Sequence, residues 1–484
     1  MVVSELAEMP SAAQSDLAPN SVGRVAIVGG GLAGLAAAVG LAGRALTVEL
    51  FEARRQLGGR ATSFRDPESG AFVDHCQHVS LGCCTNLDDF CRRTGLADLL
   101  KFYRTLHFFG PDGRRHDVSA SRWLPAPLHL LPSLVRLDYL SLSERRKIAG
   151  GLYRLARESA DGQSRTIGDW LREHRQSARA IELFWTPVIV SALSETVDRA
   201  SVSAARKVFV DGFLATRTGY ELRIPQVPLG EFYGARLEKW LDQNGITMRF
   251  GCPVKQVIGG ASGIREIALG DGRHARCDAV ILAVPWRRLG ELLDEPLHAA
   301  LPELRSIDKI ESAPITAVHL WFDRPITDLP HAVLPGRTSQ WLFNRGRQEC
   351  FESSAHHYQV VISASRNLAD QSREQTTAQV VNELRSIWPI VKDAKLLQSK
   401  AITEQHAVFS PLPGADRFRP PQKTSIPNLF LSGDWTATGW PATMEGAVRS
   451  GYLAADAVLS NFGKGTKLLV PDRQRSWLAR LLLG

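Results

Sequence analysis

The chain has 484 residues, a length typical of two or three domains. Its 44% apolar and 22% charged content is that of a soluble globular protein with a large core, which excludes a disordered or fibrous chain. The net charge of +8 comes without a nucleic-acid-reading motif or aromatic platform, so we expect no nucleic-acid partner. The seven cysteines are odd in number and lack the spacing of metal ligands, which predicts reduced thiols, no metal site and a cytoplasmic protein.

The first predicted element is a short apolar strand that leads into a glycine turn and a helix. In this turn Gly29 permits the tight bend, Gly31 lets the backbone approach a pyrophosphate, and Gly34 lets the helix pack close to the strand. Leu32 and Ala33 begin the helix, where free N–H groups and the positive end of the helix dipole favour phosphate. The order of strand, glycines and helix therefore predicts a dinucleotide site.

A second predicted strand, residues 47–52, ends on Glu52. An acid about 20 residues beyond such a glycine turn is placed to bond a ribose hydroxyl. Arg54, Gly59 and Arg60 follow directly, and we expect them to meet other parts of the same ligand.

Two later segments interleave cations with apolar residues. Residues 122–157 surround a Leu- and Pro-rich run with seven Arg and Lys side chains, and their apolar positions recur at helical spacing from 140 to 155. The tail, residues 463–484, has the same character. Such segments suit a surface that rests on anionic lipid, although a solvated basic face beside core helices explains each of them equally well. The resulting expectation is peripheral contact at the inner face of the cell membrane.

Strand signals dominate the second half of the chain. Residues 278–285 and 428–434 each contain a short apolar run, as in the middle of a buried sheet. Residues 313–322 and 358–364 alternate in the manner of a second sheet.

The strand that ends in Gly433 and Asp434 distinguishes a flavin cofactor from NAD. Its carboxylate is placed to bond the polyol arm of FAD. A helix that begins near Glu445 would then aim backbone N–H groups at the edge of the flavin where charge builds on reduction. FAD is therefore the predicted cofactor. Because only one dinucleotide fingerprint is present, we expect electrons to come from a transient donor.

These signals predict an α/β fold with α+β inserts, in which a Rossmann-like FAD-binding domain is assembled from discontinuous segments. A helical insert and a mixed-sheet substrate domain would lie against it. The expected boundaries are 1–22 for a disordered leader; 23–94, 205–294 and 425–462 for the FAD-binding domain; 95–204 for a helical domain that faces substrate and membrane; 295–424 for the sheet-rich substrate domain; and 463–484 for a basic amphipathic tail.

With these motifs the chain resembles the FAD-dependent amine oxidases and carotenoid desaturases. The matching positions are Gly29, Gly31, Gly34, Glu52, Arg54, Gly59, Arg60, Gly433 and Asp434. The resemblance implies that Glu52 binds the adenosine ribose, whereas Arg54 and Arg60 bind the phosphate region. It assigns the other cofactor contacts to Val254 at the adenine, Asp434 at the ribityl chain, and Met444, Glu445, Gly446 and Ala447 at the flavin.

A closer resemblance is to the hydroxysqualene dehydroxylases of hopanoid biosynthesis, and it rests on residues 74–87, 124–130 and 433–446. It implies that the allylic hydroxyl of a C30 isoprenoid, hydroxysqualene, is removed with hydride from reduced flavin N5 to give squalene. Hydroxide leaves poorly, so a general acid is needed. His78 and His75 are the candidate catalytic residues, because their segment should pass near the flavin.

Trp435 and Trp440 are candidate walls of an apolar substrate chamber, where their faces would attract a developing allylic cation. Core packing explains them equally well. A desaturase of phytoene, carotene or squalene would share the fold and the FAD residues, and it is the main alternative. An amine oxidase is disfavoured because no acidic or aromatic cage for a cation stands out. A flavin-free lipid carrier would be colourless when purified.

Overall fold

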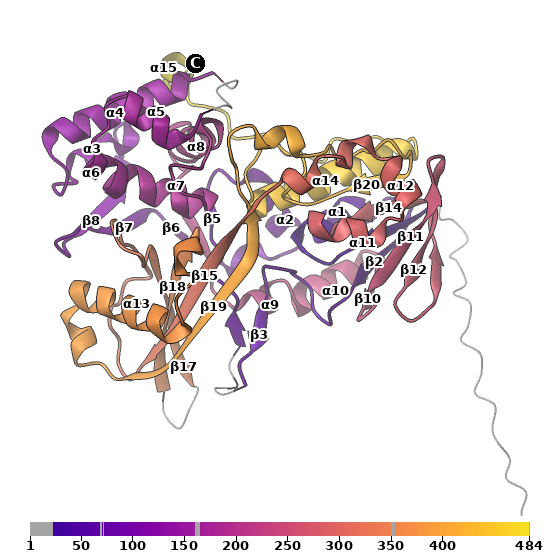
Figure 1. Ribbon diagram of the computed structural model, residues 1–484, viewed down its shortest axis with the longest axis horizontal. Coiled ribbons are helices and arrows are strands. Elements are labelled where there is room, and N and C mark those ends of the chain that lie inside the picture. Colours follow the sequence, from indigo (N-terminus) through magenta and orange to yellow (C-terminus); the bar gives the residue numbers. More distant parts are fainter. Residues whose placement is uncertain (1–22, 68–69, 71, 160–164, 350–353, 484) are drawn as a thin grey trace, which may run out of the picture.

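The computed structural model describes residues 23–483 except 68–69, 71, 160–164 and 350–353. The leader expected at residues 1–22 lies outside the described residues. Figure 1 shows two lobes: the right-hand lobe contains a parallel sheet with its helices, and the left-hand lobe places a group of helices above a larger sheet. In the part of the chain that is described, no helix is both long and apolar enough to cross a bilayer.

The right-hand lobe is built on a five-stranded sheet in which every pairing is parallel. Its strand order is β10 (Ile246–Phe250), β2 (Thr47–Glu52), β1 (Arg24–Val28), β14 (Ala279–Leu282) and β20 (Leu429–Leu431). Short apolar strands suit a parallel sheet, because both of its faces are covered. The strands come from the beginning, the middle and the end of the chain, which confirms the predicted α/β fold.

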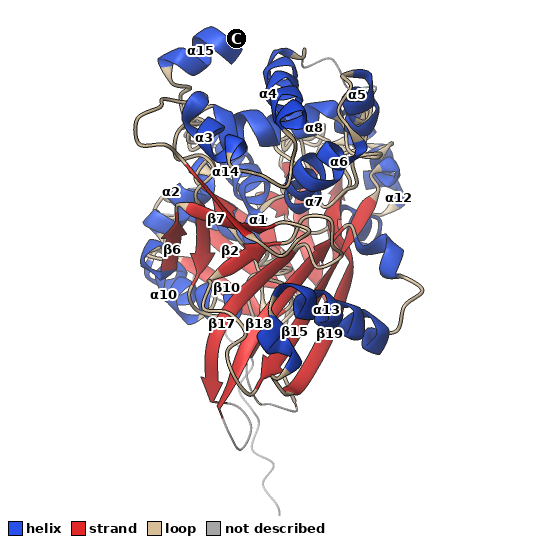
Figure 2. Ribbon diagram, turned by 90° about the vertical axis from the view of Figure 1, so that its left-hand side faces the viewer, coloured by secondary structure: helices blue, strands red, loops and turns tan. Residues whose placement is uncertain are grey.

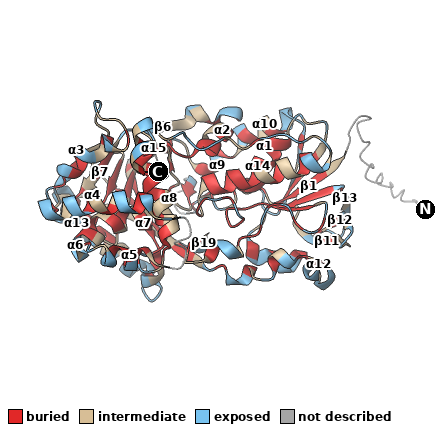
Figure 3. Cartoon of the chain, turned by 90° about the horizontal axis from the view of Figure 1, so that it is seen from above, coloured by how far each residue is buried: buried red, intermediate tan, exposed pale blue. Residues whose placement is uncertain are grey.

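Helices α1 (Leu32–Leu41) and α14 (Met444–Asn461) pack on one face of this sheet (Figure 3). Their contact is close because small residues line it: a Cβ on Gly451 would lie 2.4 Å from the Ala33 carbonyl oxygen. Helices α2 (Thr85–Arg93), α9 (Leu229–Phe232) and α10 (Ala235–Gln243) lie on the same side. The opposite face is covered by β11 (Val254–Gly260), β12 (Gly263–Leu269), β13 (His274–Arg276), α11 (Leu289–Leu292) and α12 (Glu295–Ala299).

The left-hand lobe contains a mixed sheet of seven strands, several of which lie side by side and face the viewer in Figure 2. Their order is β19 (Leu396–Phe409), β15 (Ser312–Phe322), β18 (Ser354–Ser363), β17 (Trp341–Glu349), β16 (His331–Val333), β7 (Thr105–Phe109) and β8 (Arg115–Ser119). Alternate residues of β15 face α13 (Arg373–Ile387) and form a core with it, and the intervening residues, among them His319, face away from that core. The expected mixed sheet is therefore present.

The predicted helical insert at 95–204 requires a correction. Strands β7 and β8 come from its first part and extend the seven-stranded sheet, with β16 and β7 paired in parallel. Strand β6 (Leu100–Tyr103) joins β9 (Leu222–Pro225) and β5 (Ser80–Leu81) in a small sheet. The physical reason is packing: Leu106 and Phe109 are buried in two separate cores, and a Pro-Asp-Gly turn connects β7 to β8.

Helices follow from residue 131 onward, and the apolar spacing at 140–155 predicted the longest of them. They are α3 (Leu131–Val135), α4 (Leu142–Arg157), α5 (Ile167–Glu173), α6 (Ala178–Ala180), α7 (Thr186–Leu193) and α8 (Val202–Lys207), with π-helical turns at Ile181–Trp185 and Val208–Leu214. Ser141 begins α4 in a capping box with Glu144. The tail ends in α15 (Trp477–Leu483), which packs beside α4. A hairpin of β3 (Ser63–Arg65) and β4 (Phe72–Asp74) joins the two lobes.

Candidate functional site

The turn between β1 and α1, which contains Gly29 and Gly31 and leads to Gly34 in α1, is here called the cradle. Gly29 has φ 109°, and a Cβ on Gly34 would lie 2.0 Å from the Gly29 carbonyl oxygen, so the turn and the helix are in backbone contact. Gly31 differs, because the nearest atom to a Cβ there would be the Gly59 Cα, at 3.9 Å. Within the described residues, no side chain caps α1. The open space over Gly31 and the uncapped start of the helix therefore fit a pyrophosphate.

The carboxylate of Glu52 lies at the carboxyl end of β2, beside this cradle. It accepts hydrogen bonds from the Gly30 N–H at 2.7 Å and the Arg54 N–H at 2.8 Å, and Glu52 is buried. The Cys252 N–H donates to the Glu52 carbonyl at 3.0 Å, which anchors the segment that leads into Val254. The structure thus places Glu52 against the glycine turn, 22 residues earlier in the chain, and ties it to the distant segment that leads into Val254.

Arg60 and Asp434 connect the two ends of the chain at the site. The Arg60 Nη2 lies 2.6 Å from the Asp434 Oδ1, and its Nη1 donates to the Ala407 carbonyl at 2.5 Å. The charge of Asp434 raises the pKa of the Arg60 guanidinium above its usual value. Asp434 is a buried carboxylate just beyond β20, and it is held by Arg60, which follows the second glycine pair. Such a carboxylate fits the polyol arm of FAD.

An Asp434→Asn variant is expected to bind FAD about 10- to 100-fold more weakly, because a charge-assisted hydrogen bond contributes about 1.5–3 kcal/mol. Titration of the apoprotein with FAD, followed by flavin fluorescence, measures the loss. Asp271→Asn removes an exposed ion pair to Arg273 on the hairpin of β12 and β13 and should leave the affinity unchanged. Equal affinity in the Asp434→Asn and wild-type proteins would exclude Asp434 from the site.

Of the two explanations for Trp435, the structure supports core packing and not the wall of a substrate chamber. Its side chain is 1% exposed and belongs to the core between β14, β20 and the β11–β12 hairpin. The indole N–H donates to the Val284 carbonyl at 3.0 Å. A Cβ on Gly433 would lie 2.2 Å from this indole nitrogen, so the glycine before Asp434 is needed for tryptophan packing.

Trp440 lies nearer to the helical region. The Lys207 ammonium is 4.6 Å from its ring centroid and the Arg449 guanidinium 5.6 Å, so the ring already meets two cations of the protein. This argues against a role in attracting an allylic cation. The Trp440 indole N–H is buried and has no hydrogen-bond partner among the described residues. Its place in the wall of a substrate chamber stays a prediction.

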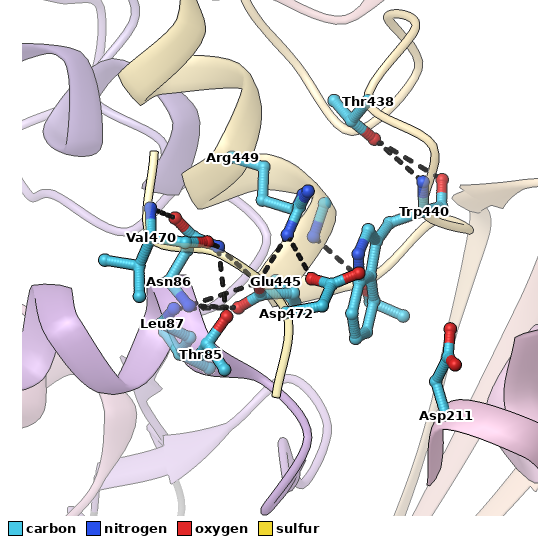
Figure 4. A network of polar contacts seen from close by, with 12 residues as sticks. Thr85, Asn86, Leu87, Asp211, Thr438, Trp440, Glu445, Arg449, Val470 and Asp472 are labelled. Atoms are coloured by element: carbon cyan, nitrogen blue, oxygen red, sulfur yellow. Dashed lines mark hydrogen bonds and ion pairs between the residues drawn. The ribbon is translucent and has the colours of Figure 1, made fainter. Parts of the chain in front are cut away.

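Glu445 is fully buried at the start of α14, and Figure 4 shows the network around it. Its carboxylate accepts hydrogen bonds from the Leu87 N–H at 2.8 Å and the Asn86 side-chain amide at 2.9 Å, and also from the Asn86 N–H. Arg449 lies 3.5 Å away and pairs with Asp472 of the tail at 2.7 Å. Burial raises the pKa of Glu445, and these partners oppose that rise.

The Glu445 side chain therefore caps α2 rather than facing a ligand, so any flavin contact at this position comes from its backbone. Thr443 caps α14 itself: its hydroxyl accepts the Gly446 N–H at 3.0 Å. The Met444 sulfur accepts a hydrogen bond from the Tyr233 hydroxyl at 3.6 Å. The contacts predicted for Met444, Glu445, Gly446 and Ala447 remain predictions.

The two candidate catalytic histidines lie on the loop after β4. The His78 Nδ1 is 2.9 Å from the Cys76 carbonyl oxygen. Because a carbonyl only accepts, Nδ1 carries a proton and Nε2 is the nitrogen that can exchange a proton with a ligand. Burial lowers the pKa of His78, and the charge of Arg60 lowers it further. His75 stacks edge-on against Phe64, with centroids 5.2 Å apart, and burial lowers its pKa too.

Arg345 of β17 holds this loop, and the sequence analysis did not identify it. One guanidinium nitrogen donates to the Gln77 side-chain oxygen at 2.5 Å, and another lies 3.1 Å from the buried Asp74 carboxylate. Asp74 also accepts the Leu229 N–H at 2.8 Å. Gln77 in turn donates to the His78 carbonyl at 3.0 Å. The only sequence signal was an arginine within a strand.

A second buried polar cluster lies on β15 and β18. The His319 Nδ1 is 3.0 Å from the His357 Nε2, and the Gln359 amide lies 3.1 Å from the His319 Nε2. Burial lowers the pKa of His319 to about 3, so this cluster is neutral at pH 7. The polar residues interrupt otherwise apolar strands, a signal that the sequence analysis overlooked. No three His, Cys, Asp or Glu side chains of the described residues are arranged to hold a metal ion.

The family profile described as Flavin containing amine oxidoreductase matches residues 32–459. A hydroxysqualene dehydroxylase of Sinorhizobium fredii is 30% identical over 456 residues, covering 90% of this chain and 98% of that protein. A zeta-carotene desaturase of Synechocystis sp. is 27% identical over 479 residues, covering 90% and 97%. Among solved structures, a putrescine oxidase bound to putrescine aligns with a TM-score of 0.66 at 17% identity, covering 90% and 99%.

The fold and the cradle define an FAD-dependent oxidoreductase of the amine oxidase and carotenoid desaturase superfamily. The chain belongs to the flavin-containing amine oxidoreductase family, because the family profile spans most of its length. FAD is its cofactor, as the sequence predicted, and the space over Gly31 and the carboxylate of Asp434 fit that molecule.

Proposed function

We propose that the protein reduces hydroxysqualene to squalene. The dehydroxylase of Sinorhizobium fredii supports this, because the similarity extends over 98% of that protein. Other relatives, 25–27% identical, are named for the desaturation of zeta-carotene and phytoene. Both groups of names indicate a long isoprenoid substrate. The two activities differ in one chemical requirement, which a dehydroxylase has and a desaturase does not.

That requirement is a proton donor. In the proposed reaction the allylic C–O bond breaks, a C–H bond forms, and the hydroxyl takes up a proton and leaves as water. FAD, when bound in its reduced state, would supply the hydride, and a transient electron donor would restore that state. A hydrocarbon substrate of a desaturase carries no leaving hydroxyl, so it would need no acid at this position.

The anchored imidazole of His78 carries the proposal. Its Nδ1 is fixed on the Cys76 carbonyl, the Gln77 side chain donates to the His78 carbonyl, and Arg345 in turn donates to the Gln77 side-chain oxygen. The ring is therefore held with Nε2 as the nitrogen that can deliver a proton to the leaving hydroxyl. The charge of Arg60, which pairs with Asp434 at the cradle, lowers the pKa of the His78 ring.

A His78→Gln variant is expected to lose about 100- to 10,000-fold in turnover, the usual contribution of a positioned general acid. Because the pKa of His78 lies below 6.5, the wild-type rate should rise as the pH falls from 8 to 6, and the variant should lose this dependence. Initial rates with reduced FAD measure both effects. His174→Gln is the matched control, since His174 makes the same kind of bond to a backbone carbonyl, at 2.8 Å, in the helical region.

The substrate is tested directly by anaerobic incubation of the holoenzyme with hydroxysqualene and reduced FAD, and in parallel with phytoene or zeta-carotene and oxidised FAD. We expect squalene, identified by mass spectrometry, from the first reaction only. Dehydrogenated products from the second reaction, without squalene from the first, would replace the proposal with the desaturase. Amine oxidation has no support in the described site beyond the family description.

A further inference from the structure

We propose that one end of the molecule docks on an anionic lipid bilayer. The surface, here called the docking surface, consists of the exposed side chains of residues 121–157 and of α15. Figures 1 and 2 both show α3, α4 and α15 together at one end of the molecule. Its apolar members are Trp123, Leu128, Leu131, Val135, Leu142, Tyr153, Trp477 and Leu481. They are eight of the eleven large apolar side chains that are exposed among the described residues, so exposure is concentrated here.

The exposed side chains of α15 do not belong to a detached tail. Ala479 and Leu483 are buried against the π-helical turn and α4, so the helix is held on the protein by one face. Trp477 and Leu481 are both 68% exposed and lie four residues apart, on the same face of the helix. The tail is therefore fixed with an aromatic and an aliphatic side chain directed outward.

The loop before α3 is fixed in the same way. Arg217 donates to the carbonyl oxygens of Ser121 and Leu124, both at 2.7 Å. The Ser476 hydroxyl donates to the Ala126 carbonyl at 2.6 Å, which ties this loop to the start of α15. Trp123 is 79% exposed on this anchored backbone. Two separate segments thus present apolar side chains from a rigid framework.

The positive charge of the docking surface indicates that it binds anionic lipid. Residues 120–157 carry seven Lys and Arg and two acids, and residues 473–484 carry three Arg and no acid. A second copy of this chain would bring two basic surfaces together, which disfavours a dimer here. Exposed tryptophan and tyrosine beside arginine suit the headgroup level of a bilayer, and the cations attract anionic lipid. The inference goes beyond the proposed function, because it requires no particular substrate.

Sedimentation of the holoenzyme with vesicles tests the inference. We expect binding to phosphatidylcholine vesicles that contain 30% phosphatidylglycerol, and at least ~10-fold weaker binding to phosphatidylcholine alone. Trp477→Ser/Leu481→Ser and Arg146→Gln/Lys147→Gln should each weaken binding to the anionic vesicles ~10-fold or more. Neither pair touches the FAD cradle, so FAD content verifies that each variant is folded.

Matched controls come from distant surfaces. Ile390→Ser removes an exposed apolar side chain beyond α13, and Arg265→Gln/Arg276→Gln removes two exposed cations from the β12–β13 hairpin. Both controls should bind like the wild type. Equal loss in the controls, no binding to anionic vesicles, or a dimer that the Trp477→Ser/Leu481→Ser variant abolishes would each overturn the proposal. Sedimentation needs no substrate, so a failure of the proposed dehydroxylation is a separate result.

Discussion

A Gly34→Ala variant is expected to unfold more readily than the wild type and to be recovered without FAD. Its Cβ would lie 2.0 Å from the Gly29 carbonyl oxygen and 3.1 Å from the Ala283 Cβ. Neither neighbour is a flexible side-chain end, so the helix must move away from the strand. Such overpacking costs about 3 kcal/mol of unfolding free energy. The same movement removes the α1 N-terminus from the cradle. Denaturant unfolding and flavin absorbance measure the two effects.

Gly31→Ala separates the ligand effect from the folding effect. Its Cβ has no protein atom nearer than 3.9 Å, so the apoprotein should be as stable as the wild type. The methyl group nevertheless enters the space that fits the pyrophosphate, and FAD affinity should fall more than ~10-fold, equivalent to about 1.4 kcal/mol. Gly150→Ala, a helical position with nothing within 4 Å, is the control. Undiminished FAD affinity in Gly31→Ala would remove the cradle from the cofactor site.

A Glu445→Ala variant is expected to lose about 3–5 kcal/mol of unfolding free energy, because it leaves the buried N–H groups of Asn86 and Leu87 without their acceptor and removes one of the two carboxylates beside Arg449. Glu445 is 0% exposed and joins α14, α2 and, through Arg449, the tail. Urea unfolding of the apoprotein measures the loss without the contribution of bound FAD.

Glu445→Gln tests the cause, since it keeps the volume and one acceptor oxygen but removes the charge. We expect an intermediate loss, because the Asn86 and Leu87 donors keep an acceptor while Arg449 keeps only Asp472 as a counter-charge. Glu291→Ala removes an exposed ion pair with Arg288 and should change stability by less than about 1 kcal/mol. If Glu445→Ala lowered the free energy of unfolding by no more than this control, the network around Glu445 would not stabilise the packing of α14 against α2.

The part of the site that fits the dinucleotide was predictable from short sequence patterns. The glycine spacing, the carboxylate of Glu52 and the Gly433–Asp434 pair each follow a short apolar strand, and all of them meet at the carboxyl edge of one parallel sheet. The sequence also indicated α4 by its apolar period, and the structure adds the capping box at Ser141.

Other features depended on long-range packing. Strands β7 and β8 were not expected, because β16, which joins them to the large sheet, lies more than 200 residues away in the chain. Trp435 was a candidate both for the substrate chamber and for the core, and only the packing places its indole in the core behind Gly433. Arg345 went unnoticed because its partners, Asp74 and Gln77, come from a distant part of the chain.

By itself the amino-acid sequence determined the fold class and the cofactor, and it predicted the glycines of the cradle, because a phosphate-binding turn is encoded within about 30 contiguous residues. Only the tertiary structure decided that Glu445 caps α2, that Arg345 fixes the His78 loop and that α15 shares a surface with α4. Each of these contacts joins segments that the chain separates by 200 residues or more, and a local pattern carries no information about such pairs.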